Sequence, residues 1–177
     1  MANSKAFDFE KVKLRTPFRW LLIGASQSGK SEFVFDLLSN AEKILDKVPK
    51  RVIYCYGVFQ ERFREFAQDS KIDIEFREGF DPNLLPTLEK ESNADNIIVI
   101  VDDLMLQDIW KDLALIFTQG RHANLSIMLL MQNPFFRGHK SAALYGTTIT
   151  RNASGIVLFR TLADRQAALI LGKKVID

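Results

Sequence analysis

The residues whose types and spacing best fit a chemical role lie between Gly24 and Ser31, where the sequence reads GASQSGKS. Gly24, Gly29, Lys30 and Ser31 fit the pattern G-x-x-x-x-G-K-[ST], in which backbone N–H groups surround nucleotide phosphates. The lysine reaches the β- and γ-phosphates, and the hydroxyl after it ligates Mg²⁺. The sequence therefore predicts an ATP and Mg²⁺ site formed by Gly24, Ser26, Gln27, Ser28, Gly29, Lys30 and Ser31. The alternative is an ordinary glycine-rich turn with an exposed lysine.

Two aspartates, Asp102 and Asp103, follow a continuous run of Ile and Val residues. At the carboxyl end of a buried strand, Asp102 can hold Mg²⁺ through water, and Asp103 can orient or deprotonate an attacking water. Many ATPases have the longer glutamate at the second position. The alternative for Asp103 is a capping role at the start of the following helix.

Two further polar residues flank the apolar run 125–132. Gln132 ends it, and in P-loop sheets with an additional strand such a residue lies beside the γ-phosphate, so we expect a sensor; a solvated strand end is the alternative. Arg121 precedes the run, at the amino end of the predicted sheet, and we expect a finger that completes a neighbouring subunit's site, or else a surface arginine. His122 and His139 lack partners at metal-ligand spacing, which indicates surface or structural roles.

Apolar runs and helical patterns alternate along the chain and predict the elements that position these residues. Continuous apolar or alternating runs indicate strands within 18–24, 51–58, 71–78, 96–105, 125–132 and 155–160. Apolar residues at helical spacing indicate helices within 34–45, 59–66, 106–117 and 162–171. The strict alternation in 71–78 marks a strand near a sheet edge. The order predicts an α/β fold, a three-layer RecA-like P-loop domain whose mostly parallel sheet has helices on both faces.

The composition fits one globular domain, because 47% of the 177 residues are hydrophobic and 26% are charged. A net charge of +2 neither requires nor excludes a polyanionic partner. Every apolar stretch is shorter than the roughly 20 residues of a membrane span, and the start lacks a secretory pattern, so we expect no membrane partner and no secretion. We predict an N-terminal arm over 1–16, a P-loop ATPase domain over 17–177, and a buried, unreactive Cys55.

The segment 133–140, NPFFRGHK, leaves the predicted sheet at its nucleotide-facing end. Arg137 and Lys140 are candidate contacts to nucleic-acid phosphates. The alternative is that the two phenylalanines of the segment only fix the loop to the core.

Taken in order, these motifs resemble the FtsK/HerA superfamily of DNA-pumping ATPases. The segments RVIYCYGVFQ, IEFREG, VIVDDLM, MQNPFFRG and TITRNASGIVLFR resemble more closely the genome-packaging ATPases of Polinton-type elements, virophages, adintoviruses and related double-stranded DNA viruses. The likeness runs from about residue 18 to residue 171.

The resemblance implies a homo-oligomeric ring, a pentamer or hexamer, that hydrolyses ATP to push double-stranded DNA into a capsid. It implies Walker A roles for Lys30 and Ser31 and Walker B roles for Asp102 and Asp103. It also implies that Gln132 is the sensor and Arg121 the finger. Packaging ATPases often lack an arginine at the position of Arg121, so Arg151 or Arg160 is an alternative finger. Capsid vertex proteins are the implied partners, and the implied location is the virion or a viral assembly site in the host cytoplasm or nucleus.

Two other functions share the phosphate-binding pattern. A small nucleoside or nucleotide kinase would have the same loop and length, but such kinases close an arginine-bearing lid that the sequence does not clearly contain. A non-catalytic capsid module that uses nucleotide only as an assembly switch is the second alternative.

Overall fold

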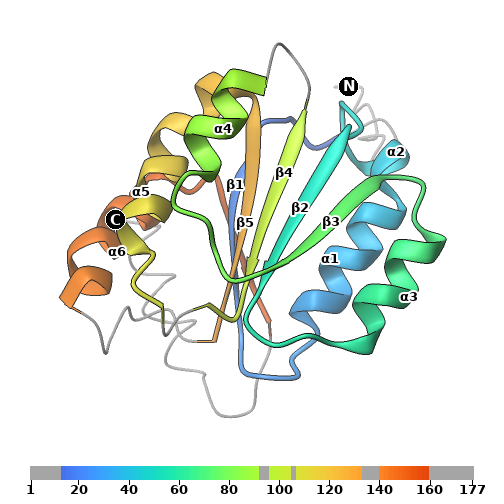
Figure 1. Cartoon of the computed structure of the whole chain (residues 1–177), viewed down its shortest axis with the longest axis horizontal. Helices are drawn as coiled ribbons and strands as arrows, with labels where there is room; N and C mark the ends of the chain where they lie inside the picture. Colours follow the sequence, from blue (N-terminus) through green and yellow to red (C-terminus); the bar gives the residue numbers. More distant parts are fainter. Residues whose placement is uncertain (1–12, 92–95, 105–106, 133–139, 160–177) are drawn as a thin grey trace, which may run out of the picture.

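The computed structural model describes residues 13–91, 96–104, 107–132 and 140–159 (Figure 1). Its centre is a six-stranded sheet with the strand order β3-β2-β4-β5-β1-β6, and all of its strand pairs are parallel. The strands are β1 (Arg19–Ile23), β2 (Arg51–Tyr56), β3 (Asp73–Glu78), β4 (Ile97–Asp102), β5 (Leu125–Met131) and β6 (Gly155–Leu158). Each lies within a predicted run, which confirms the α/β class and the parallel sheet.

Strand β5 lies between β4 and β1, as the additional-strand arrangement predicts. In the register of these pairs, Ile23 at the end of β1 is opposite Met131, and Asp102 at the end of β4 is opposite Leu130. All carboxyl ends of a parallel sheet meet at one edge, which is where ligands bind in such folds. The sheet therefore brings the loops after Ile23, Asp102 and Met131 together.

Position in the sheet explains the sequence of each strand. Every residue of β4 and β5 is buried, because these central strands have neighbours on both sides and helices above and below. Strand β3 is at the edge and is only partly buried, as its alternating sequence predicts. There Glu75 accepts hydrogen bonds from Arg77 Nε at 2.5 Å and Arg51 Nη2 at 2.6 Å.

Helices cover both faces of the sheet and complete the three layers (Figure 1). One face packs against α1 (Lys30–Ser39), α2 (Ala41–Ile44) and α3 (Glu61–Asp69). The other packs against α4 (Leu84–Glu91), α5 (Trp110–Gln119) and α6 (Lys140–Asn152). The core is accordingly split into two buried apolar clusters, one on each side of the sheet.

The helices differ from the sequence expectation in three places. The helix expected over 34–45 is broken at Asn40, whose backbone leaves the helical conformation and whose side-chain amide donates to Asp36 O at 2.9 Å. Phe59 precedes α3 rather than lying on it. The patterns missed α4 and α6, because Pro86 lies in the first turn of α4, and Gly146 and several threonines lower the helix propensity of α6. The helix expected over 162–171 lies outside the described residues.

Residues 13–16 are attached to the domain at the end of α2. Leu14 forms a parallel β-bridge with Leu45, and Thr16 donates to Asp46 Oδ1 from both its N–H and its hydroxyl, at 2.9 Å each. In the described part of the chain, no helix is both long and apolar enough to cross a membrane.

Candidate nucleotide site

The loop 24–29 joins β1 to α1 and is shaped by its two glycines. Gly24 N–H donates to Met131 O at 3.0 Å, which ties the start of the loop to the end of β5. A Cβ on Gly24 would lie 2.6 Å from both Phe159 Cβ and Ser28 Oγ, so only glycine fits there. Gly29 has φ +93°, a left-handed conformation that favours glycine, and α1 begins at the next residue. The loop therefore ends at a helix N-terminus, which favours phosphate binding.

The side chain of Lys30, the first residue of α1, folds back into this loop, and the residue is only 8% exposed. Its Nζ donates to Gly24 O at 2.7 Å and to Ala25 O at 2.8 Å. Burial lowers the pKa of Lys30 below its usual 10.5, while the negative charges of Asp102 and Asp103 oppose that shift. This buried position contradicts the reading of the segment as a turn with an exposed lysine.

Ser31 and Asp102 are in direct contact, although they are far apart in the sequence. Ser31 Oγ donates to Asp102 Oδ2 at 2.8 Å, and Asp102 is 7% exposed. A serine hydroxyl that donates a hydrogen bond to a carboxylate keeps its oxygen lone pairs available for a cation. Tyr54, on the neighbouring strand β2, also donates to Asp102 Oδ2, at 2.5 Å.

Asp103 and Gln132 form a second pair at the same edge of the sheet. Gln132 Nε2 donates to Asp103 Oδ1 at 2.9 Å, and both side chains are exposed. Asp103 has φ +56°, which turns its side chain away from the direction of β4. Helix α5 begins only at Trp110 and has no side-chain cap, so the alternative role of Asp103 as a helix cap is wrong.

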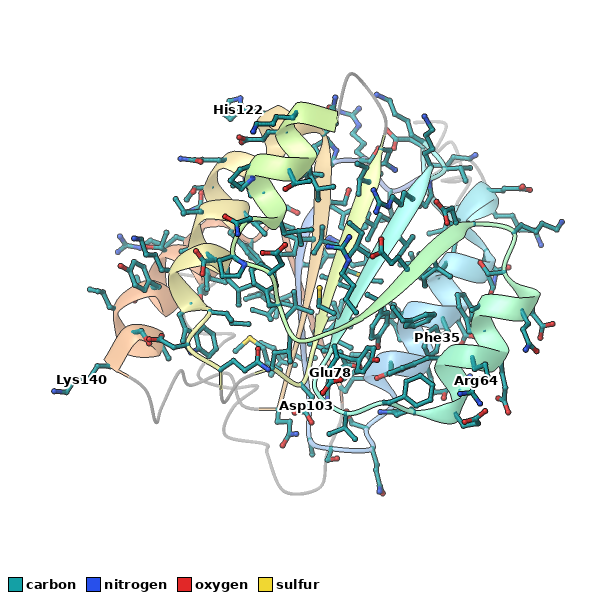
Figure 2. The ribbon with its side chains drawn as sticks, viewed as in Figure 1. Phe35, Arg64, Glu78, Asp103, His122 and Lys140 are labelled. Atoms are coloured by element: carbon teal, nitrogen blue, oxygen red, sulfur yellow. The ribbon has the colours of Figure 1, made fainter. Side chains whose placement is uncertain are left out.

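These residues surround a cavity of about 370 Å³, within the range of small-molecule sites. It is lined by Ser26, Gln27, Ser28, Gly29, Lys30, Ser31, Glu32, Gln60, Asp102, Asp103, Leu130 and Gln132. Figure 2 shows Asp103 at the carboxyl end of the sheet, where this cavity lies.

The residues fit a nucleotide with its magnesium ion. The hydroxyl of Ser28 is buried without a hydrogen-bond partner among the described residues, so the loop has an unused polar group. Ser31 and Asp102 offer the oxygen ligands that Mg²⁺ prefers. The described residues contain no cluster of three or more His, Cys, Asp or Glu that could hold a metal.

The sequence of the chain matches a known protein family. The sequence profile described as "Poxvirus A32 protein" matches residues 4–139, more than half of the chain. The chain belongs to this family. It is a family of genome-packaging ATPases of the FtsK/HerA type, so the predicted family and enzyme class, a P-loop ATPase, are confirmed. No curated protein sequence matches the chain.

Solved structures similar to this A32-family chain share its fold at low sequence identity. The cytoplasmic domain of EssC has a TM-score of 0.62 and 14% identity over 88% of this chain. The cytoplasmic domain of the Thermomonospora curvata Type VII secretion ATPase EccC has a TM-score of 0.55 and 16% identity over 85% of this chain. The A32-family chain spans 33% and 22% of those two chains, respectively.

The other predicted residues of the A32-family chain are not among the described residues that line the cavity. Arg121 is in the short 3₁₀ helix Gly120–Ala123 that precedes β5, so its backbone is at the amino end of the sheet, as predicted. Arg151 is exposed near the end of α6, shortly before β6. Lys140 is exposed at the start of α6, well apart from Asp103 in Figure 2. Arg137, His139 and Arg160 lie outside the described residues, and His122 is exposed at the amino end.

Three residues near the cavity were missed by the sequence analysis. Tyr54 was read only as part of a strand, Gln60 lines the cavity, and a Cβ on Gly57 would lie 2.6 Å from Asp103 O. All belong to β2 or to the loop after it, and β2 pairs with β4. The position of these residues in the chain could have revealed them. Polar residues in the loop after a strand that pairs with β4 lie close to Asp102.

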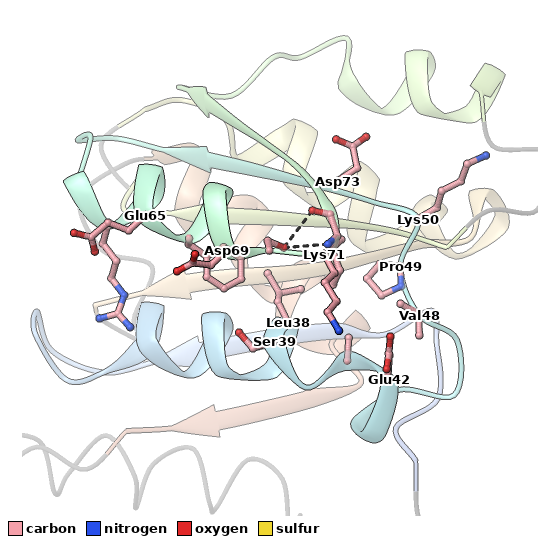
Figure 3. Close-up of a pocket in the computed structure, with 15 residues that line it drawn as sticks. Leu38, Ser39, Glu42, Val48, Pro49, Lys50, Glu65, Asp69, Lys71 and Asp73 are labelled. Atoms are coloured by element: carbon pink, nitrogen blue, oxygen red, sulfur yellow. Dashed lines mark hydrogen bonds between the residues drawn. The ribbon is translucent and has the colours of Figure 1, made fainter.

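A larger cavity, of about 640 Å³, lies at the opposite end of the sheet (Figure 3). It is bounded by α1, α2, α3 and the residues just before β2 and β3, and its charged residues are of both signs. It contains none of the predicted site residues.

Proposed function

We propose that this protein hydrolyses ATP to move double-stranded DNA into a viral capsid. The observation that carries the proposal is the cavity at the carboxyl end of the sheet, where Lys30, the Ser31–Asp102 contact and the Asp103–Gln132 pair come together. Membership of a genome-packaging ATPase family supports DNA as the cargo.

In the proposed reaction, the backbone N–H groups of the loop and the Lys30 ammonium bind the phosphates. Ser31 and Asp102 would hold Mg²⁺, which would supply positive charge against the phosphates. Asp103 orients the attacking water and accepts its proton on Oδ2, because Oδ1 is engaged by Gln132 Nε2. Gln132 fixes the Asp103 carboxylate and senses the γ-phosphate.

The Asp103–Gln132 pair favours hydrolysis over the kinase alternative. A kinase must keep water away from the γ-phosphate, whereas this pair places a carboxylate and an amide that are both exposed to solvent in the lining of the cavity. A purely structural nucleotide switch would need no such pair. ATP hydrolysis is therefore the function that these side chains support best.

The oligomer and the partners form the wider part of the proposal. We infer a homo-oligomeric ring, a pentamer or hexamer, in which Arg121 of one subunit completes the site of the next. Arg137 and Lys140 are proposed contacts to DNA phosphates. The ring docks on capsid vertex proteins at a viral assembly site in the host cytoplasm.

ATPase assays of the purified chain, with and without duplex DNA, test the proposal. We expect hydrolysis that duplex DNA stimulates, and loss of ATP binding and hydrolysis in Lys30→Ala. Lys43→Ala, which removes an exposed lysine from α2, is the matched control and keeps both activities. Phosphate transfer to a nucleoside, or unchanged ATP turnover in Lys30→Ala, contradicts the proposal.

A further inference from the structure

We propose that Tyr54 is a positioning residue of the metal site, whose buried hydroxyl holds the Asp102 carboxylate in the orientation that receives Mg²⁺. The inference rests on the nucleotide site described under Proposed function. It assigns a role to β2, a strand that carries none of the residues predicted to bind nucleotide.

The parallel pairing of β2 with β4 places Tyr54 within reach of Asp102. Tyr54 is opposite Ile100, and Tyr56 is opposite Asp102, so these four side chains share one face of the sheet. From its place two residues earlier on β2, the long Tyr54 side chain reaches along this face. Its hydroxyl donates to Asp102 Oδ2 at 2.5 Å, a distance typical of a hydroxyl bound to a charged carboxylate.

Two hydroxyls from different elements hold the same carboxylate oxygen. Ser31 on α1 and Tyr54 on β2 both donate to Asp102 Oδ2, and among the described residues no hydrogen bond ends on Oδ1. Oδ1 therefore keeps its lone pairs for the water shell of a cation. Ser31 must itself serve as a metal ligand, whereas Tyr54 has no such task. Tyr54 can thus fix the Asp102 carboxylate without also having to bind the metal, as Ser31 must.

The surrounding aromatic rings fix the position of the Tyr54 hydroxyl. Tyr54 is fully buried, and its ring centroid lies 5.7 Å from that of Phe35, 5.1 Å from Phe63 and 5.3 Å from Phe76. These rings hold the phenol in the position from which its hydroxyl donates to Asp102 Oδ2. Phenylalanine at this position would keep the ring contacts and remove the hydroxyl alone.

Nucleotide binding measured with and without magnesium tests the inference. In Tyr54→Phe we expect the Mg²⁺ concentration needed for half-maximal binding of a fluorescent ATP analogue to rise by about tenfold or more, as for other groups that orient metal ligands. Binding of the analogue in excess EDTA should change by less than about twofold, because Lys30 and the loop are untouched. Tyr56→Phe is the matched control, since Tyr56 lies opposite Asp102 but does not donate to it.

A companion variant separates failure of this inference from failure of the proposed function. Lys30→Ala should lose analogue binding both with Mg²⁺ and in EDTA. If Lys30→Ala binds normally, the nucleotide site itself is wrong. If Lys30→Ala loses binding but Tyr54→Phe requires no more Mg²⁺ than Tyr56→Phe, only the positioning role of Tyr54 is overturned.

A second measurement uses the nucleotide-free chain and does not depend on activity. In chemical unfolding, the destabilisation caused by Tyr54→Phe should be much smaller when Asp102→Ala, which removes the acceptor, is already present, because the two side chains share one hydrogen bond. Additive effects of the two substitutions would overturn the inference. So would a Tyr54→Phe chain that fails to fold, since the hydroxyl would then serve stability.

Discussion

Asp102 and Asp103 are adjacent in the sequence but occupy different environments. Asp102 is 7% exposed and accepts hydrogen bonds from two hydroxyl groups, whereas Asp103 is exposed and accepts one hydrogen bond from the Gln132 amide. Asp103 also differs in its backbone, which has the left-handed φ of +56°. Neighbouring carboxyl groups in unlike surroundings can take unlike tasks, as in the metal binding and water activation proposed for these two.

Replacement of Asp103 by asparagine tests the water-activating role. Asparagine tolerates φ +56° better than most residues and can keep a hydrogen bond to Gln132, so the fold and ATP binding should persist. Loss of the proton acceptor should lower kcat by about 10²- to 10⁴-fold. Steady-state hydrolysis and analogue binding measure the two effects. Asp36→Asn, which changes an exposed aspartate on α1, is the control, and turnover of Asp103→Asn equal to that of this control contradicts the assignment.

The buried position of Lys30 predicts a pH-dependent stability difference. Because the pKa of Lys30 is lowered in the folded chain, the unfolded chain binds more protons between that lowered value and 10.5. The free energy of unfolding of the unsubstituted chain should therefore rise with pH in this window, relative to Lys30→Met. Urea unfolding at a series of pH values measures the difference, with Lys43→Met as the control. Parallel stability curves for the unsubstituted chain and Lys30→Met would refute the lowered pKa.

At the scale of elements, the loops after β2 and β4 are packed backbone to backbone. Gly57 N–H donates to Asp102 O at 3.2 Å, and a Cβ at Gly57 would approach Asp103 O to 2.6 Å. The second contact is with backbone, which cannot rotate away as a flexible side chain can. Gly57 therefore allows the turn that carries Asp103 to lie beside the end of β2.

Gly57→Ala should impair catalysis more than nucleotide binding. The added methyl group displaces the Asp103 turn, and a shift of about 1 Å in a catalytic group can lower the rate by about 10²-fold. The phosphate loop lies on other strands and should still bind ATP. Gly120→Ala is the matched control, because its added Cβ would meet nothing closer than 3.4 Å. Comparable kcat values for the two variants would show that the close approach is unimportant.

At the scale of the whole molecule, the predicted site residues lie at both ends of the sheet. The cavity with Lys30 and Asp102 is at the carboxyl end, whereas the backbone of Arg121 is at the amino end. His122, the next residue, and Asp103 are at opposite ends in Figure 2. The proposed finger role of Arg121 therefore requires a nucleotide bound by another subunit.

Mixing of inactive subunits tests this arrangement. Arg121→Ala should abolish turnover in the assembled protein while it spares ATP binding. Mixed with Lys30→Ala, it should recover part of the activity, because some interfaces then pair an intact loop with an intact arginine. ATPase activity over a range of mixing ratios measures the recovery. Activity that stays at zero at every ratio would mean that the arginine acts within its own chain, or that another arginine is the finger.

The strands and the residues of the site were predictable to different degrees. Buried parallel strands are largely apolar, so β1, β2, β4 and β5 could be located from the sequence. The apolar run also located β6, although β6 is an edge strand and is only partly buried. Helices α4 and α6 were not predicted, because their local sequences have a weak helix propensity. Packing of Leu84, Leu88 and Ile149 against the sheet outweighs that weak propensity.

The sequence by itself determined the phosphate loop, the acidic strand end and the alternation of strands and helices along the chain. These follow from local rules: glycines where a turn needs them, carboxylates after an apolar run, and parallel connections between alternating elements. Only the tertiary structure decided which side chains meet. The Tyr54–Asp102 and Gln132–Asp103 hydrogen bonds and the contact of Gly57 with Asp103 each join separate elements. Such contacts depend on strand register and close packing, which no local pattern of residues contains.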